Sequence, residues 1–163
     1  IEPANKLQKG CRYYIFKKSI QPLWEDAENT GGREISVQYR LPQIKQDQKN
    51  RHSSPDLINI SKEIHTKAQE KWKKLVIAVL CNKEEYFHEK DFINGIEFNC
   101  RANAIKVGIW TKPIKEMQYE SLKMNLLNIL EYNENEDEIF KTEVIALEED
   151  REEVHPNIKK YET

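Results

Sequence analysis

The chain has 163 residues, a length that suits one domain of ordinary size. Its 26 Lys and Arg residues against 28 Asp and Glu residues give a formal net charge of -2, so bulk electrostatics will not bind long nucleic acid and any such contact must be local. A composition of 33% charged residues, 38% hydrophobic residues and only 5 Gly argues against membrane, collagen-like and low-complexity classes.

The first part of the chain predicts two strands joined by a loop. Residues 11–17 are rich in aromatic and branched side chains, which favours a strand entered through Gly10. Residues 21–32 contain Pro, Asn, Gly and acidic residues and predict a loop that carries Trp24. Residues 33–41 alternate between apolar and polar side chains, as a half-buried strand does. We expect these two strands to pair with each other.

The middle of the chain predicts a polar connection followed by a helix. Residues 42–56 are dominated by Gln, Lys, Asn and Ser, which indicates a long exposed connection. Thr66 and Gln69 have the spacing of a capping box at the start of a helix that ends near Asn82. The helix itself is predicted by apolar residues at spacings of three and four, namely Ile64, Ala68, Trp72, Leu75 and Val79.

The last part predicts two more strands, a second helix and a final strand. Residues 96–102 and 105–110 alternate as strands, and residues 113–132 have amphipathic helical spacing that includes Met117 on the apolar side. Residues 139–147 predict the final strand, and residues 148–163 form an acidic tail that we expect to be loose. Strands and helices do not alternate regularly, so we expect an α+β fold, an antiparallel sheet with two helices on one face.

Two groups of residues are candidates for ligand binding. Trp24 next to Glu25 in a loop offers a stacking platform beside an acceptor for ligand N–H groups. Lys106 and Trp110 lie on one open strand face, and Arg101 precedes them across a short turn, which suits a phosphorylated aromatic ligand. Taken singly, each group is better explained by a plainer interpretation, because most tryptophans belong to the core or its rim and most surface charges are merely solvated.

Read together, these residues resemble one known family. The segments that carry the resemblance keep their order and spacing over most of the chain to residue 147, and they are Gly10-Cys11, Pro22-Leu23-Trp24-Glu25-Asp26, Gly31-Gly32-Arg33, Lys71-Trp72, and Asn99-Cys100-Arg101-Ala102 with Lys106 and Ile109-Trp110-Thr111. The sequence is similar to the family of eukaryotic translation initiation factor 4E, the subunit that binds the cap of messenger RNA.

The resemblance implies a fold and a ligand. The fold is a curved antiparallel sheet with helices on its convex face and a concave pocket for the 7-methylguanosine 5′ cap. Trp24 would stack on the methylated base, Glu25 would accept the guanine N–H groups, and Trp110 would touch the methyl group. The resemblance implies phosphate binding by Arg101, Lys106 and Arg33. The chemistry of the residues agrees, because methylation makes guanine cationic, and both an indole face and a carboxylate favour a cation.

The resemblance also implies partners and a cellular role. Capped messenger RNA is one partner, and the helix with Trp72 would bind the scaffold factor 4G or the 4E-binding inhibitor proteins. Trp72 fits simple packing against the sheet equally well, and Lys73 and Lys74 depart from the family pattern. We expect a cytoplasmic protein of translation initiation, with the nucleus as a second compartment, that is no enzyme and needs no cofactor or metal. The alternatives are a cap-binding repressor that recruits no scaffold and an enzyme that processes guanine nucleotides.

One departure from the family is large. The family holds the methylated base between two tryptophans, and the first belongs to an N-terminal hairpin that precedes Ile1. We therefore expect residues 1–163 to be one cap-binding domain that is N-terminally incomplete, lacking this hairpin and the first helix. A missing stacking partner would weaken binding by about 1 to 3 kcal/mol.

The remaining reactive residues predict no chemistry. The 4 His residues show no ligand spacing and no HExxH pattern, so neither metal nor triad chemistry is expected. The 3 Cys residues form no CxxC pair, which predicts reduced thiols in a cytosolic protein without structural zinc. Cys81 and Cys100 lie in apolar stretches and are expected to be core thiols.

Overall fold

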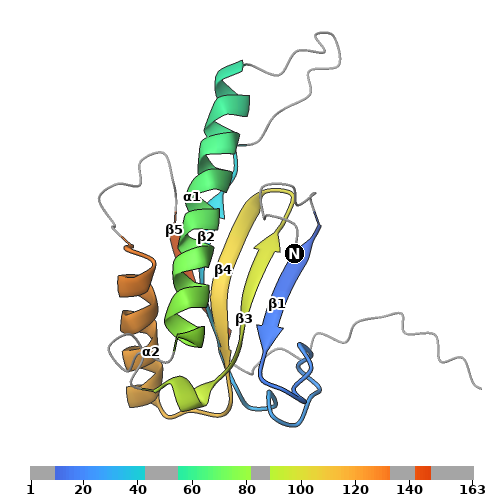
Figure 1. Cartoon of the computed structure of the whole chain (residues 1–163), viewed down its shortest axis with the longest axis vertical. Helices are drawn as coiled ribbons and strands as arrows, with labels where there is room; N and C mark the ends of the chain where they lie inside the picture. Colours follow the sequence, from blue (N-terminus) through green and yellow to red (C-terminus); the bar gives the residue numbers. More distant parts are fainter. Residues whose placement is uncertain (1–9, 43–54, 82–88, 133–141, 148–163) are drawn as a thin grey trace, which may run out of the picture.

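One antiparallel sheet of five strands, in the order β1-β3-β4-β2-β5, forms the centre of the computed structural model (Figure 1). The structure describes residues 10–42, 55–81, 89–132 and 142–147. The strands are β1 (Arg12–Phe16), β2 (Glu34–Arg40), β3 (Ile93–Cys100), β4 (Ala104–Thr111) and β5 (Thr142–Leu147). Helices α1 (Pro55–Leu80) and α2 (Glu116–Ile129) lie on one face of the sheet, which confirms the expected α+β architecture (Figure 1).

The hairpin of β3 and β4 separates the first two strands of the chain. A short turn joins the hairpin, and the N–H of Arg101 donates to the carbonyl of Ala104 at 2.8 Å. Strand β1 pairs with β3, whereas β2 pairs with β4 and β5. The expected pairing of the first two strands is therefore wrong. The loop between them crosses the end of the sheet, and the later hairpin occupies the two positions between β1 and β2.

Helix α1 runs along the strands on one face of the sheet (Figure 1). It supplies most of the helical side chains of the core. It begins at Pro55, about two turns earlier than its strongest apolar spacing, because a proline fits the first turn of a helix. The predicted capping box is wrong: Thr66 lies inside the helix, and its hydroxyl donates to the carbonyl of Lys62 at 3.0 Å. The predicted apolar face is confirmed at four positions, with Ile64, Ala68, Trp72 and Leu75 all buried.

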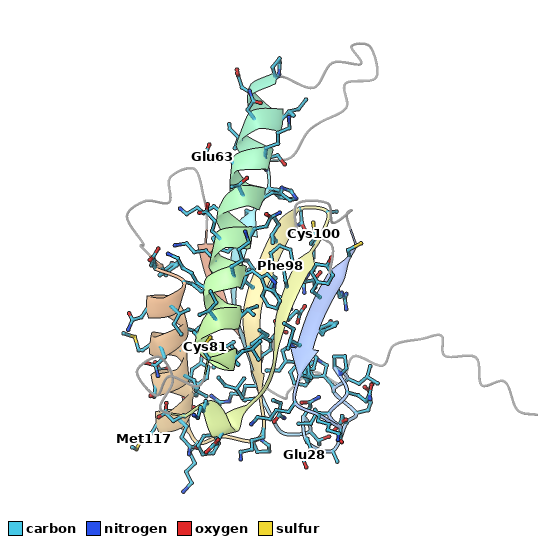
Figure 2. All side chains as sticks on the ribbon, in the orientation of Figure 1. Glu28, Glu63, Cys81, Phe98, Cys100 and Met117 are labelled. Carbon is cyan, nitrogen blue, oxygen red and sulfur yellow. The ribbon has the colours of Figure 1, made fainter. Side chains whose placement is uncertain are left out.

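Helix α2 is shorter than the predicted range. It begins at Glu116 after Lys115, whose N–H donates to the side-chain oxygen of Gln118 at 2.8 Å. The side chain of Met117 is 86% exposed and lies at the outer end of the helix, away from the sheet (Figure 2). Its predicted place on the apolar side is wrong, because the buried side of the short helix is formed by Tyr119, Leu122 and Leu126.

The predicted core thiols divide into one buried and one exposed cysteine. Cys100 is buried at the end of β3, as expected, whereas Cys81 is exposed directly after α1 ends. The expectation for Cys81 is wrong, because α1 ends at Leu80, itself 59% exposed, and Cys81 follows beyond the part of the helix that packs on the core. All 3 cysteines are free thiols.

Several expectations concern residues outside the described ranges. The acidic tail of residues 148–163, most of the polar connection and the first residues of the predicted final strand are among them. Of the helices that the structure does describe, none combines the length and apolar character that crossing a membrane requires.

Candidate ligand-binding site

The sheet face opposite the helices carries the candidate site. Phe98 of β3, labelled in Figure 2, packs against Trp72 of α1 with ring centroids 5.8 Å apart. Because side chains alternate along a strand, its neighbour Glu97 points to the other side. Glu97 contacts Lys106 and Trp110 of β4 through its carboxylate. We call this surface the site face and define it by Glu34, Glu97, Lys106 and Trp110.

A loop held by internal hydrogen bonds positions Trp24 on the site face. The loop joins β1 to β2 at one end of the sheet and includes Glu28, which is labelled in Figure 2. The buried amide of Asn29 donates to the carbonyls of Gln21 at 2.7 Å and Leu23 at 2.8 Å. The backbone N–H of Gln21 donates to the Asp26 carboxylate at 2.8 Å, which helps to hold the pKa of Asp26 below its ordinary value. These bonds fix the loop on both sides of Trp24.

Trp24 lies flat on Trp110. The ring centroids are 3.9 Å apart and the planes differ by 14°, which is a parallel stack. Trp110 is 4% exposed and Trp24 38% exposed. Tyr14 and Phe16 of β1 meet the edge of Trp110 with centroids 6.2 Å and 5.5 Å away. The four rings form an aromatic cluster in which Trp24 covers Trp110 and leaves no space between the two indoles.

Three charged side chains form a buried ion cluster beneath these rings. The ammonium of Lys106 lies 2.5 Å from the Glu34 carboxylate and 3.4 Å from the Glu97 carboxylate. The side chains of Lys106, Glu34 and Glu97 are only 6%, 3% and 2% exposed. Glu97 also accepts the indole N–H of Trp110 at 2.9 Å and the amide of Asn99 at 2.9 Å. The ion cluster, defined as Glu34, Glu97 and Lys106, is thus joined directly to the aromatic cluster.

The ion cluster contains two carboxylates and one ammonium. Burial raises the pKa of Glu34, the ammonium of Lys106 opposes this rise, and the second carboxylate, Glu97, adds to it. Burial also raises the pKa of Tyr14, and the charge of Glu97 contributes in the same direction. Both shifts have the sign expected for acidic groups in a region of low polarity and excess negative charge.

The structure brings together some of the predicted site residues and separates others. Trp24, Trp110 and Lys106 meet on the site face, and Glu25 is exposed directly beside Trp24 in the loop. Arg101 is exposed in the turn between β3 and β4. Arg33 is not brought to this group: it pairs with Glu116 of α2 at 3.0 Å. The role of each residue toward a ligand stays a prediction.

Arg33 and the site face lie on opposite sides of β2. The guanidinium of Arg33 is 4.7 Å above the ring of Tyr119, a residue on the buried side of α2. Because neighbouring side chains alternate along a strand, Glu34 then points to the other side, where it meets Lys106.

Sequence reasoning missed Glu34 and Glu97. Both occupy polar positions of alternating strands, so each looks like a solvated surface acid. Both are in fact buried, with side chains only 3% and 2% exposed. Across the strands Glu34 lies opposite Trp110, and Glu97 lies opposite Gly108. The signal that would have found them is that both acids fall on the same strand face as Lys106. That comparison requires the order of the strands, which the sequence did not provide.

A hollow lies on the helical side, between α1 and α2. It has a volume of about 430 Å³ and is lined by Lys74, Ile77, Ala78, Asn125, Asn128, Ile129 and Glu131. Lys74 and Lys71 both pair with Glu131, at 2.5 Å and 2.9 Å, and lower the pKa of that carboxyl to about 2. Trp72, the predicted scaffold contact, is 8% exposed and packs on Phe98 in the core. Its contact with a partner stays a prediction.

Within the described ranges, no group of three or more His, Cys, Asp or Glu side chains is arranged to hold a metal ion.

Comparison with known proteins points to one family. The family model described as "Eukaryotic initiation factor 4E" matches residues 1–157. Eukaryotic translation initiation factor 4E of Candida albicans is 28% identical over 136 residues, which cover 83% of this chain and 55% of that protein. The factor of Aplysia californica is 34% identical over 119 residues, covering 71% and 44%. The chain spans about half the length of these curated relatives.

Solved structures share the fold. The complex of C. elegans eIF4E-3 with the 4E-binding protein Mextli has a TM-score of 0.66 at 24% identity, covering 90% of this chain and 75% of that chain. The complex of Ascaris suum eIF4E-3 with m7G cap has a TM-score of 0.61 at 25% identity, covering 88% and 67%. The sheet with its helices on one face is therefore an arrangement that known proteins also adopt.

Proposed function

The chain belongs to the eukaryotic initiation factor 4E family, and on this premise we propose that it binds the 7-methylguanosine cap of messenger RNA in translation initiation. The observation that carries the proposal is the placement of Trp24. A braced loop holds this large ring partly exposed, beside an exposed carboxylate and on top of a second indole. A related protein from Ascaris suum has been solved with m7G cap, which supports the same ligand class.

The chemistry of these groups suits a methylated guanine. Methylation at N7 gives the base a positive charge, and an indole face attracts a cation placed over it. Glu25 offers two oxygens to the two N–H donors on the guanine edge. Trp110 contributes a second indole, which Glu97 orients through its N–H. Trp24 must shift from Trp110 for a ligand to contact both rings, because the two indoles touch in the structure.

The phosphate side of the proposed ligand falls to Arg101. Its guanidinium is on an exposed turn at the end of the β3–β4 hairpin, where phosphate oxygens have free access. The two other predicted phosphate ligands are engaged elsewhere, Lys106 with Glu34 and Arg33 with Glu116. Of the three predicted phosphate ligands, we therefore assign phosphate binding to Arg101.

We further propose that the helical side binds a partner protein of the 4E-binding type or the scaffold factor 4G. The hollow between α1 and α2 is lined by the exposed side chain of Ile77 and the half-buried side chain of Ile129. An amphipathic helix buries such side chains by laying its apolar face into a groove. The likeness in fold to a protein solved with the 4E-binding protein Mextli is compatible with this use of the surface.

Substitution of the loop carboxylate tests the cap proposal. Glu25→Gln keeps the shape and removes the charge, so the preference for 7-methyl-GTP over GTP falls by about tenfold to a hundredfold, the range for hydrogen bonds to a charged group. Glu28→Gln is the matched control, an exposed acid of the same loop. Tryptophan fluorescence measures both affinities. A preference unchanged by Glu25→Gln contradicts the assignment, and hydrolysis of either nucleotide favours the enzyme alternative.

A further inference from the structure

We propose that Glu34 and Glu97 set the ligand preference of the site by pairing with Lys106. The site then recognises the cationic base, and the phosphates of the ligand contribute little to the affinity. The inference rests on the proposed function and names the ligand more closely. The expected ligand of the site is a 7-methylguanine nucleotide, free or at the 5′ end of a capped RNA. Its affinity should depend little on the number of phosphates.

The first step is the engagement of the Lys106 ammonium. It lies 2.5 Å from Glu34 and 3.4 Å from Glu97, and its side chain is 6% exposed. To grip a phosphate the ammonium would have to leave both carboxylates. Two buried acids would then share a site of low polarity without their cation, which is strongly unfavourable. Lys106 therefore neutralises the protein's own acids and is withheld from the ligand.

The second step is the sign of the charge that remains. Two carboxylates and one ammonium leave an excess of one negative charge on the ion cluster when all three groups are ionised. A phosphate that approaches this region meets repulsion, whereas a cationic ring over Trp110 is attracted. Glu97 connects the two effects, because the carboxylate that pairs with Lys106 also accepts the indole N–H of Trp110.

The third step concerns two exposed cations at the hairpin end of the sheet. Arg12 of β1 is exposed and donates to the hydroxyl of Tyr14 at 3.4 Å. This hydrogen bond raises the pKa of Arg12, and the charges of Glu97 and Glu34 add to the rise. Arg101 is also exposed, in the hairpin turn. Solvent and salt screen an exposed guanidinium, so each adds only a weak attraction for phosphate.

The wild-type protein gives the first test, a titration with 7-methyl-GMP, 7-methyl-GDP and 7-methyl-GTP. The inference predicts that each added phosphate improves affinity by less than about fivefold, the upper limit for an exposed ion pair. It also predicts that affinity for 7-methyl-GTP changes by less than about threefold between about 50 mM and about 200 mM salt. A tenfold gain per phosphate, or a steep salt dependence, overturns it.

The second test removes one carboxylate charge. Glu34→Gln keeps the side-chain shape and releases Lys106 from one partner, so affinity for 7-methyl-GTP rises by about tenfold and affinity for 7-methyl-GMP changes much less. Glu120→Gln is the control, an exposed acid that pairs with Lys123 on α2. An unchanged phosphate series in folded Glu34→Gln protein overturns the inference. If the variant does not fold, the wild-type series decides alone.

The outcomes separate the inference from the proposed function. A preference for 7-methyl-GTP over GTP together with a steep phosphate series keeps the cap proposal and overturns only the inference. Equal affinity for 7-methyl-GTP and GTP contradicts the cap proposal. The series of GMP, GDP and GTP then decides the inference by the same criterion, because Glu34 and Glu97 would keep Lys106 from the phosphates of any nucleotide.

Discussion

Replacing Lys106 by methionine isolates the electrostatic role of the ion cluster. The variant keeps a long apolar stem but leaves the carboxylates of Glu34 and Glu97 buried without their cation. Removing one partner of a buried ion pair costs about 3 to 5 kcal/mol. A domain of this kind unfolds with a free energy of about 5 to 15 kcal/mol, so most variant molecules should remain folded. Urea unfolding at pH 7 measures the loss.

The stability loss caused by Lys106→Met should also depend on pH, in a direction that the pKa of Glu34 determines. Burial raises the pKa of Glu34 above 4.5, so in the folded state the ionised form is the unfavourable one. The loss caused by Lys106→Met is therefore largest at pH 7 and shrinks as pH falls toward 4.5 and the carboxyl takes up a proton. Lys123→Met is the control, because Lys123 pairs at 3.3 Å with the exposed Glu120 and its loss costs less than about 1 kcal/mol. Equal, pH-independent losses in the two variants would refute the reasoning.

Two further predictions concern stability elsewhere in the chain. The folded pKa of Glu131 is about 2 because Lys74 and Lys71 pair with it, so its contribution is complete above pH 4.5 and disappears as pH falls toward 2. The carboxylate of Glu131 and the side chain of Lys74 are exposed to solvent, which screens the pairing although Lys71 itself is buried. Glu131→Gln should therefore lower the unfolding free energy by less than about 1 kcal/mol at pH 6 and by nothing at low pH, and a larger loss at both pH values would argue against the ion pairs. In Gly108→Ala the new Cβ would lie 2.5 Å from the Cβ of Ser36, so β2 and β4 must separate. This should cost about 1 to 3 kcal/mol and lower the melting temperature by about 3 to 9 °C, and a melting temperature unchanged in calorimetry would show that the strands yield freely.

Local patterns predicted the strands and helices but not the order of the strands. Alternation along residues 33–41 and helical spacing after residue 64 depend on neighbours in the chain, so they can be seen in the sequence. Pairing depends on segments far apart. The β3–β4 hairpin begins more than 50 residues after β2, yet it lies between β1 and β2 in the sheet. No local sequence pattern predicts this strand order.

The candidate site was predicted in its parts but not in its electrostatics. The sequence placed Trp24 in a loop, and Lys106 and Trp110 on one strand face, and the structure confirms these positions. The expected openness of that face is wrong, because Trp24 covers Trp110, and acids from neighbouring strands enclose Lys106. Such burial depends on the packing of side chains across strands, which one strand's alternation does not specify.

The most direct test of the account is a titration of the wild-type chain with 7-methyl-GTP and GTP, followed by tryptophan fluorescence, to which Trp24 and Trp110 contribute two of the 3 tryptophans. Because only the methylated base is cationic, the indole and carboxylate groups should bind 7-methyl-GTP at least about tenfold more tightly, with a change in emission as the stacked rings separate. Equal affinity for the two nucleotides would contradict the claim that this surface recognises the cap.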